Sequence, residues 1–425
     1  MLAGRAGAHV PALTRQWMTT PFYLSPTFQI LFATAAGMAF GWAAPAHAMQ
    51  LLPLGDLFID AIRLLAGPFI FCTVCAGIGA LGSLRQLGEI GIKGFIYFEV
   101  LALLALSSGA AGAWLMQPGA GFQLDPARAA AIAALPAPSF SDTLLSTFTG
   151  SMALQLLLAA LVCGMALTVA GTRAARLTAL VAQAGNLLFK LVRIILLLAP
   201  LAAFCAVAYT VGRYGLASVA PLAKLLGAIY LTTVLFVAVV LGAVARACGF
   251  SLWRFILFLK EELVLAFGTA SSFAAMPGLI DKLCRAGCPG SVAGVLIPAG
   301  YSLNLNGSSI YLTLALVFLA QASGVDLDFA QYAAIVAIAM VASKAASGVA
   351  GSAFIVLGAM LTVVPAIPPA SLLFIFGIER LLKCRPLANI IGNGVACMAV
   401  SAWMGQLDST RVSAALTSAP GLRRA

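Results

Sequence analysis

The sequence predicts an all-α integral membrane protein, and three observations lead to this fold class. Hydrophobic residues make up 62% of the 425-residue chain and charged residues only 9%, with a mean hydropathy of +1.05, whereas a soluble domain carries roughly 25% charged residues. Several stretches run past about 18 residues with almost no charge, which is the length that a helix needs to cross the hydrocarbon of a bilayer. Finally, the basic residues lie mainly between these apolar stretches.

The distribution of charge predicts how the chain crosses the bilayer. A net charge of +11 raises nucleic acid as a partner, but the basic residues instead follow the rule that loops rich in Lys and Arg stay cytoplasmic. The basic connections that would face one side contain Arg85, Arg173, Arg176, Arg246, Arg254, Lys282 and Arg285. The alternate connections contain Asp125, Asp142, Asp326 and Asp328. We therefore expect a multi-pass protein in a lipid bilayer, with both termini cytoplasmic and no nucleic-acid partner.

Two apolar segments in the last part of the chain are interrupted in the middle by small polar residues. Residues 252–282 are interrupted at Gly268–Ser272, and residues 330–365 at Ser347–Ser352. Each segment is consistent with a helix that enters the membrane, turns and leaves on the same side, because non-helical backbone is tolerated only where protein or water satisfies its polar groups. Two such segments in corresponding positions are typical of a transporter site built on inverted repeats. The alternative is two spanning helices with small-residue packing faces.

The segment between them, residues 291–320, carries polar residues that are costly in lipid. Its centre reads Asn304-Leu305-Asn306-Gly307-Ser308-Ser309. Such a cluster must face partners or an ion, and backbone carbonyls freed by unwinding at Gly307 would suit a cation. Hydrogen bonding between helices through the Asn side chains is the alternative.

The last apolar segment, residues 369–403, contains the charges that point most clearly to a ligand. Arg385, Asn389 and Asn393 are spaced four residues apart and so line one stripe of a helix. The planar guanidinium matches a carboxylate with two parallel hydrogen bonds, which favours an anionic substrate. Arg380 and Lys383 are expected to snorkel or to pair with Glu379. Pro386 cannot donate to the carbonyl of Leu382, so a kink is expected there.

The sequence indicates neither an enzyme nor a cofactor. Its two histidines, His9 and His47, both lie near the N-terminus, which leaves no His cluster for a metal or a catalytic base. No pair of Asp residues lies in the middle of an apolar segment. We expect no cofactor and predict no metal site.

Ordered motifs over nearly the whole chain resemble those of one family of transporters. They are Pro53–Asp56, Phe71–Val74, Tyr97–Glu99, Gln117–Gly121, Glu261–Leu263, Ile297–Ser302, Gly307–Thr313, Gly351–Leu357 and Asn389–Ala396. The set resembles the dicarboxylate/amino acid:cation symporter family, which includes the glutamate transporters, and in particular its bacterial C4-dicarboxylate branch.

The resemblance implies eight transmembrane helices and two re-entrant helical hairpins with inverted repeats, assembled as a homotrimer in the bacterial inner membrane. A transport domain would slide against a fixed scaffold in an elevator motion. The implied segments are 1–22 (cytoplasmic), 23–89 (scaffold helices 1 and 2), 90–117 (helix 3), 118–142 (external loop), 143–214 (scaffold helices 4 and 5), 215–251 (helix 6), 252–290 (hairpin 1), 291–329 (helix 7), 330–368 (hairpin 2), 369–408 (helix 8) and 409–425 (cytoplasmic tail).

The resemblance also implies the residues of the site. One substrate carboxylate would lie at the hairpin tips together with Asn389, because N-termini of half-helices present unpaired N–H groups to an anion. The other carboxylate would meet Arg385 and Ser308. The tip residues are Ser271 and Ser272 in the first hairpin and Gly348, Val349, Gly351 and Ser352 in the second. The residues implied in cation coupling are Asn304, Asn306, Glu379 and Asn393.

Departures from the family pattern define the expected substrate and coupling ion. Amino acid carriers of the family place an Asp three residues before the arginine, where this chain has Leu382, or Lys383 with the alignment gap moved. Neither side chain accepts an ammonium, so symport of a C4-dicarboxylate such as succinate, fumarate or malate is favoured. A sodium-coupled aspartate or glutamate symporter and a non-transporting dicarboxylate sensor are the alternatives.

Protons are the favoured coupling ion and sodium is possible. The family Asp of the mid-helix motif is Asn306 here, and hydroxyls that help to hold sodium are replaced by Leu101 and Ala102. Cations of this kind prefer carboxylate and carbonyl oxygens. Glu379 is the expected proton carrier, whereas Glu99 is expected to bond a nearby hydroxyl or amide.

Overall fold

The structure is a computed structural model, and it is all-helical wherever the chain can be described. The described residues are 26–79, 84–121, 152–216, 219–272, 275–346, 352–361, 367, 371–379 and 381–417. Every regular element among them is a helix, which confirms the expected all-α class. The N-terminal segment 1–22, most of the loop 118–142, and Gly348, Val349 and Gly351 lie outside the described residues.

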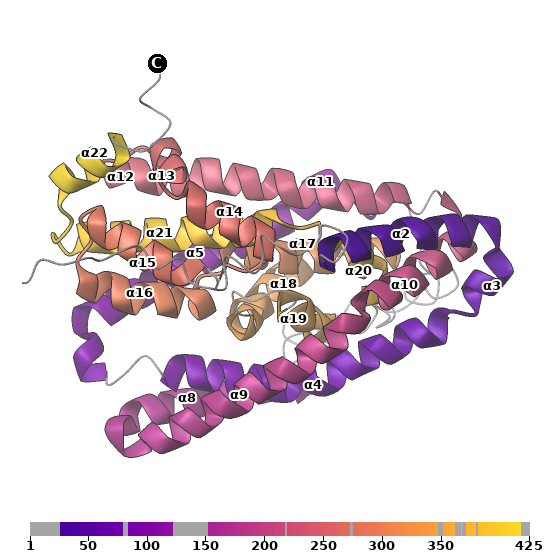
Figure 1. Cartoon of the computed structure of the whole chain (residues 1–425), viewed down its shortest axis with the longest axis horizontal. Helices are drawn as coiled ribbons and strands as arrows, with labels where there is room; N and C mark the ends of the chain where they lie inside the picture. The colour runs from indigo at the N-terminus through magenta and orange to yellow at the C-terminus, as the bar shows by residue number, and fades with distance from the viewer. Residues whose placement is uncertain are drawn as a thin grey trace, which may run out of the picture.

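The structure divides into two groups of helices, which are visible on opposite sides of Figure 1. In the first group α4 packs against α8 and α9, while α10 packs against α2, α3 and α4. The bounds of this group are α2 Pro26–Ala43, α3 Pro45–Met49, α4 Leu52–Gly79, α8 Met152–Ala170, α9 Ala175–Ile195 and α10 Ala199–Tyr214. These helices run together along the lower and right-hand edge of the molecule (Figure 1).

The second group is built around α5, α16, α17 and α21, which pack against one another. Its longer helices are α5 Leu84–Met116, α11 Val219–Phe236, α16 Gly290–Leu303, α17 Asn306–Ala322, α18 Phe329–Ala342 and α21 Cys384–Trp403. Its shorter helices are α12 Gly242–Ala247, α13 Leu252–Phe258, α14 Lys260–Thr269, α15 Met276–Arg285, α19 Ser352–Met360, α20 Leu372–Glu379 and α22 Ser409–Thr417. A π-helical stretch, Val237–Leu241, joins α11 to α12, and a short 3₁₀ turn, η7 (Ser343–Ala345), follows α18.

Four candidate membrane spans occur among the described residues, judged by length and apolar composition. They are Gly88–Met116, Val219–Ala247, Gly290–Ala322 and Cys384–Trp403. Leu64 in α4 and Val169 in α8 expose more than 70% of their surface. Apolar surface of this extent is stable only against lipid or another protein.

The span Gly290–Ala322 lies at the centre of the second group, and its second half, α17, is buried along nearly its whole length. The span packs against α5 and α21, and α17 also packs against α11, α18 and α19. Because α17 is covered on all sides, polar groups in it must find partners within the protein. Thr313 does so by donating from its hydroxyl to the carbonyl of Leu106 in α5, at 2.8 Å.

Two of the central helices are broken near their middle. Between α16 and α17 the chain leaves helical geometry at Asn304 (φ −130°, ψ 57°) and Leu305 (φ −93°, ψ 67°). α20 ends at Glu379 and α21 begins at Cys384, and the described residues between them, Leu381–Lys383, belong to neither helix, so the kink expected at Pro386 is found as an interruption just before that proline. Pro386 then lies in the first turn of α21, where a missing N–H costs no helical hydrogen bond. The two breaks free backbone groups inside the protein.

α2 packs closely on α10 at Gly37 and Gly41, which are spaced four residues apart. A larger residue there is expected to destabilise the protein. A methyl group added at Gly41 would lie 2.5 Å from the carbonyl oxygen of Ala208. We expect Gly41→Ala to lower the free energy of unfolding by about 1–3 kcal/mol, because backbone atoms cannot move aside. Thermal unfolding of the purified protein in detergent measures this effect.

Gly227→Ala in α11 is the matched control, since an added methyl group there meets nothing within 4 Å. It should be neutral or gain up to about 1 kcal/mol from helix propensity. Equal effects at the two glycines would contradict the proposed role of the α2–α10 contact.

Candidate functional site

The candidate site forms where the N-terminus of α17 meets the N-terminus of α21. A methyl group added at Gly307 would lie 2.5 Å from the carbonyl oxygen of Arg385 and 2.8 Å from its Cα atom. Only glycine lets the two backbones approach so closely. The contact brings both helix breaks into one region, and with them Ser308, Arg385 and Asn389.

Asn389 satisfies the N–H groups that the first break leaves free. Its Oδ1 atom accepts hydrogen bonds from the backbone N–H groups of Gly307 (2.9 Å) and Ser308 (3.4 Å), and its Nδ2 atom donates to the hydroxyl of Ser308 (3.3 Å). The first N–H groups of a helix have no partner within that helix. Asn389 therefore acts as an N-cap that is supplied by another helix.

Arg385 is 9% exposed, although it carries a full charge within a candidate span. Its Nη2 atom forms an ion pair with Oε1 of Glu379 at the end of α20. Its Cζ atom lies 4.3 Å from the centre of the Tyr311 ring, which gives a cation–π contact. The side chain is thus held by a carboxylate and an aromatic face.

The structure adds a partner for Glu379 that the sequence did not offer, because Glu379 pairs with Arg385. The Lys383 ammonium lies 5.9 Å from the ring centre of Phe267 in α14. Arg380 lies outside the described residues. The expectation that Arg380 and Lys383 snorkel or pair with Glu379 therefore stays a prediction.

A residue of α11 holds the break between α20 and α21, where Glu379 meets Arg385. The Tyr230 hydroxyl on α11 donates a 2.7 Å hydrogen bond to the carbonyl of Leu381. This carbonyl lies in the non-helical stretch between α20 and α21. The position of Arg385 therefore depends on α11 as well as on α17 and α20.

Three of the residues predicted for cation coupling are Asn304 and Asn306 at the α16–α17 break and Asn393, one turn after Asn389 in α21. The Nδ2 atom of Asn304 donates to Oδ1 of Asn393 at 3.0 Å, which is the hydrogen bond between helices that the sequence left open as an alternative. Asn306 is fully buried, and neither its Oδ1 nor its Nδ2 atom has a hydrogen-bond partner. Oδ1 of Asn304 is also buried without a partner. Buried polar atoms of this kind call for a water molecule or an ion.

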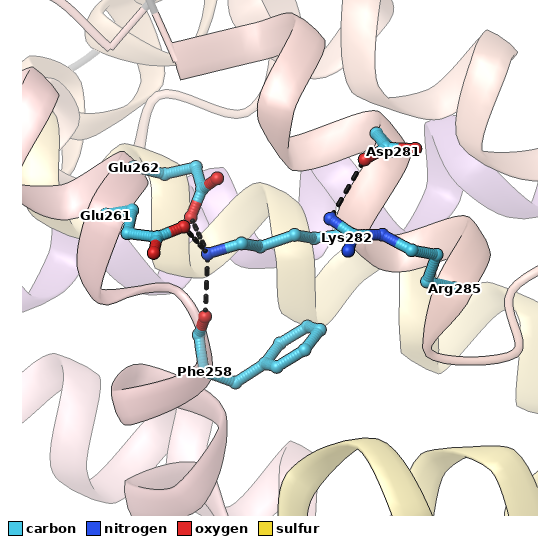
Figure 2. A network of polar contacts seen from close by, with 6 residues as sticks. All are labelled: Phe258, Glu261, Glu262, Asp281, Lys282 and Arg285. Carbon is cyan, nitrogen blue, oxygen red and sulfur yellow. Dashed lines mark hydrogen bonds and ion pairs between the residues drawn. The ribbon is translucent and has the colours of Figure 1, made fainter. Parts of the chain in front are cut away.

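A network of charged residues joins the two helices of the first interrupted segment, α14 and α15 (Figure 2). The Lys282 ammonium in α15 pairs with Glu262 at 2.7 Å and Glu261 at 2.9 Å in α14, and it donates to the carbonyl of Phe258 at 3.1 Å. The start of α14 and the end of α15 are therefore neighbours. Lys282 was expected only as a basic loop residue, but the structure buries it.

At the opposite end of these two helices the chain turns at Ala270. This residue adopts a left-handed conformation (φ 53°, ψ 28°), which is uncommon for a residue other than glycine, and such backbone strain is often found at functional sites. Ser271 and the buried Ser272 follow directly. The predicted tip residues of this segment therefore lie on a sharp turn beyond the end of α14.

Only part of the second interrupted segment can be described. Ser352 is buried at the first position of α19, and α19 packs against α17 and α4. The other predicted tip residues, Gly348, Val349 and Gly351, lie outside the described residues. The role of Ser271, Ser272 and Ser352 in substrate binding stays a prediction.

Two residues near the site, Tyr311 and Lys344, make contacts with charged residues that the sequence did not predict. Tyr311, noticed only within a motif, forms the aromatic surface under Arg385, and its buried hydroxyl has no hydrogen-bond partner. Lys344 in η7 forms a 2.8 Å ion pair with Glu99 in α5. This pair corrects the expectation that Glu99 bonds a hydroxyl or amide. A lysine directly before the Ser/Gly-rich interruption was the available signal.

Comparison with known proteins identifies the family. The sequence profile of the sodium:dicarboxylate symporter family matches residues 27–403. The chain belongs to this family of transporters. It is therefore a multi-pass membrane protein and not an enzyme. Among the residues that the structure describes, no group of three or more His, Cys, Asp or Glu side chains is placed to hold a metal ion.

Relatives in the family match the chain along nearly its full length. A C4-dicarboxylate transport protein of Cupriavidus necator is 44% identical over 419 residues, which cover 95% of this chain and 97% of the relative. A C4-dicarboxylate transport protein of Burkholderia pseudomallei is 43% identical over 415 residues, which cover 94% of this chain and 97% of the relative. The symporter family and these relatives agree with the resemblance that the motifs indicated.

Asn389 provides a test of how the site is assembled. Asn389→Ala removes the acceptor for two buried N–H groups and should cost about 1–3 kcal/mol of stability. Asn389→Asp keeps the acceptor oxygens, and the Ser308 hydroxyl can rotate to donate to them, so most of this loss should be avoided. Thermal unfolding in detergent separates the two variants. Equal destabilisation by both would contradict the capping role.

Proposed function

We propose that this protein is a secondary active symporter that carries C4-dicarboxylates such as succinate, fumarate and malate into the cell together with protons. The observation that carries the proposal is the buried Arg385, whose guanidinium is held at a double helix break in a sodium:dicarboxylate symporter chain. The names of the relatives, which are C4-dicarboxylate transport proteins, support the substrate class.

The geometry supports a site for two carboxylates. A guanidinium matches one carboxylate with two parallel hydrogen bonds, and Arg385 already pairs through its Nη2 atom with a carboxylate of the protein, Glu379. A substrate carboxylate would take the place of Glu379. The second carboxylate would lie toward Ser271 and Ser272, with the N-terminus of α19 at Ser352 as a further source of N–H groups.

The absence of an acidic residue before Arg385 argues for a substrate without an amino group. At the two positions that align with the ammonium-binding Asp of amino acid carriers the chain has Leu382, which is buried, and Lys383, whose ammonium points to Phe267. A buried ammonium of a substrate without a carboxylate partner is very costly. Aspartate and glutamate are therefore disfavoured as substrates.

The pair of Arg385 and Glu379 suggests how protons would be coupled to substrate. When a substrate carboxylate binds Arg385, Glu379 loses its ion pair with that guanidinium. Loss of a neighbouring positive charge in a buried site favours the protonated form of a carboxyl group. Glu379 would therefore carry the proton inward with the substrate and return with its negative charge paired to Arg385.

Sodium is the second candidate for the coupling ion. The amide oxygens of Asn304 and Asn306 have no hydrogen-bond partner, and amide oxygens are suitable ligands for hard cations. Neutral amides bind such a cation more weakly than carboxylates do. This difference favours the proton over sodium.

We further propose the architecture that the family resemblance implies. It comprises eight spanning helices and two re-entrant hairpins with inverted repeats, in an elevator-type homotrimer of the bacterial inner membrane with both termini cytoplasmic. The network around Lys282 supports the first hairpin, because it pairs the start of α14 with the end of α15 (Figure 2). The separate group of α4, α8, α9 and α10 in Figure 1 supports a scaffold distinct from the transport domain.

Substitution of Arg385 tests the substrate site. Arg385→Ala should reduce labelled succinate uptake into proteoliposomes to background, because the carboxylate fork is lost. Arg385→Lys should weaken succinate binding by at least about tenfold, or about 1.4 kcal/mol, since a point charge cannot replace the bidentate geometry. Arg254→Ala, which removes an exposed arginine from α13, is the control and should transport normally. Wild-type affinity in Arg385→Lys would rule out the fork.

Separate gradients of sodium and pH test the coupling ion. A pH gradient without sodium should drive uptake, and Glu379→Gln should abolish this accumulation while succinate exchange continues, because a neutral amide imitates the protonated state. Glu89→Gln, at an exposed carboxylate of α5, is the control. Rapid uptake driven by a sodium gradient alone would count against proton coupling.

The same preparation separates the alternative functions. Excess aspartate should not compete with succinate, whereas strong competition would indicate an amino acid carrier. Succinate binding to purified protein without any flux would indicate a sensor.

A further inference from the structure

A second buried ion pair, outside the proposed substrate site, has no part in the function described so far. Lys344 lies in η7, at the end of α18, where the first arm of the proposed second hairpin stops. Its Nζ atom is 2.8 Å from Oε1 of Glu99 in α5 and 3.1 Å from the carbonyl oxygen of Leu303 at the end of α16. The lysine is only 7% exposed. A buried ammonium is costly, so this position is in need of an explanation.

The carbonyl of Leu303 is available because of the break between α16 and α17. In a continuous helix it would accept a hydrogen bond from the N–H of Gly307, four residues later. Gly307 instead donates to Asn389, and the Leu303 carbonyl accepts from Lys344. Carbonyls freed by unwound helices bind coupling cations in transporters. The Lys344 ammonium therefore lies at the C-terminal end of α16, where a free carbonyl carries partial negative charge.

We propose that Lys344 is a tethered cation, which supplies at the α16–α17 break the positive charge that a free sodium ion would otherwise bring. Glu99 is its counter-ion. The inference rests on the proposed function only in taking this break as the place where a coupling cation would bind. It adds that the protein carries one such charge within its own chain.

Electrostatics explain why the tethered charge would replace sodium at this position. Two like charges a few ångströms apart in a protein interior repel each other strongly. With Lys344 in place, a sodium ion cannot bind the same carbonyl and the same carboxylate. Because η7 packs against α16 and α17, the ammonium also holds the end of α18 to the break without any free ion.

An ordinary structural ion pair is the competing explanation, and single variants distinguish the two. If only the pair matters, Glu99→Gln and Lys344→Met should have the same effect. If the ammonium replaces a cation, Lys344→Met leaves the Glu99 carboxylate beside the Leu303 carbonyl, and these oxygens form a sodium site. Glu99→Gln keeps the ammonium and creates no such site.

The test measures thermal unfolding of the full-length protein in detergent, without dicarboxylate, in sodium chloride or choline chloride at equal ionic strength. Lys344→Met should be stabilised by sodium in a saturable way, since a ligand that binds only the folded state raises its stability. Wild type, Glu99→Gln and the double variant Lys344→Met/Glu99→Gln should not respond to sodium. A Lys344→Met protein that is indifferent to sodium would overturn the proposal, as would a wild type that responds equally.

Two further variants keep the result interpretable. Lys224→Met removes an exposed lysine from α11, and it should show no sodium response. If Lys344→Met unfolds in choline, purification in sodium followed by sodium removal should release unfolded protein, whereas Lys344→Arg should stay folded in both salts. Unfolding of Lys344→Met regardless of sodium would contradict the proposal.

The outcome is separable from the proposed function because no dicarboxylate is present. Sodium stabilisation of Lys344→Met combined with no binding of succinate would support the tethered cation and refute the dicarboxylate site. Where succinate binds, its affinity for Lys344→Met should rise about tenfold on adding sodium, because the competent state becomes more populated.

Discussion

A guanidinium buried between apolar helices must always have an anion beside it, and this requirement organises the centre of the protein. Arg385 meets it with Glu379 and with the face of Tyr311. To place these groups together, the chain breaks before α21 and again before α17, and Gly307 lets the two ends touch. Each freed backbone group then needs a partner of its own, which Asn389, Tyr230 and Lys344 provide. The breaks, the caps and the buried charges therefore depend on one another.

Exchange of anions at Arg385 connects this constraint to transport. A carboxylate of the protein can hold the arginine while the site is without substrate, and a carboxylate of the substrate can replace it. In either state the buried charge is compensated, which the low-dielectric interior demands. In the proposed mechanism a proton then neutralises the Glu379 carboxylate that has been displaced. Lys344 extends the same logic to the neighbouring break, where the protein supplies a positive charge of its own in place of an ion.

The sequence was sufficient to predict the features that follow from the free-energy cost of placing polar groups in lipid. The apolar composition predicted the helical membrane class, and the mid-segment Asn304–Ser309 cluster and Pro386 predicted the two breaks, because polar groups and proline disturb a spanning helix in a local and recognisable way. Arg385 and Asn389 were found from their spacing on one helix stripe. The functional assignment itself needed the family motifs, since composition alone does not distinguish one carrier from another.

The sequence could not predict which charges would pair. Glu379 pairs with Arg385 across the interruption of the helix, a partner that its spacing in the sequence did not indicate. Glu99 and Lys344 are separated by more than two hundred residues, and their pairing depends on the packing of η7 near α5 and α16. In the sequence, Tyr311 is one aromatic residue within an apolar segment, and nothing around it indicates its contact with Arg385. Such contacts are tertiary, and no local pattern encodes them.

The exchange of Glu379 for substrate at Arg385 is tested most directly by measuring proton uptake when succinate binds to the purified protein in weakly buffered solution. A pH-sensitive dye would report protons taken up in proportion to the succinate bound, and the uptake should disappear in Glu379→Gln while succinate still binds. Binding without proton uptake in the wild type, or uptake that persists unchanged in Glu379→Gln, would contradict the account.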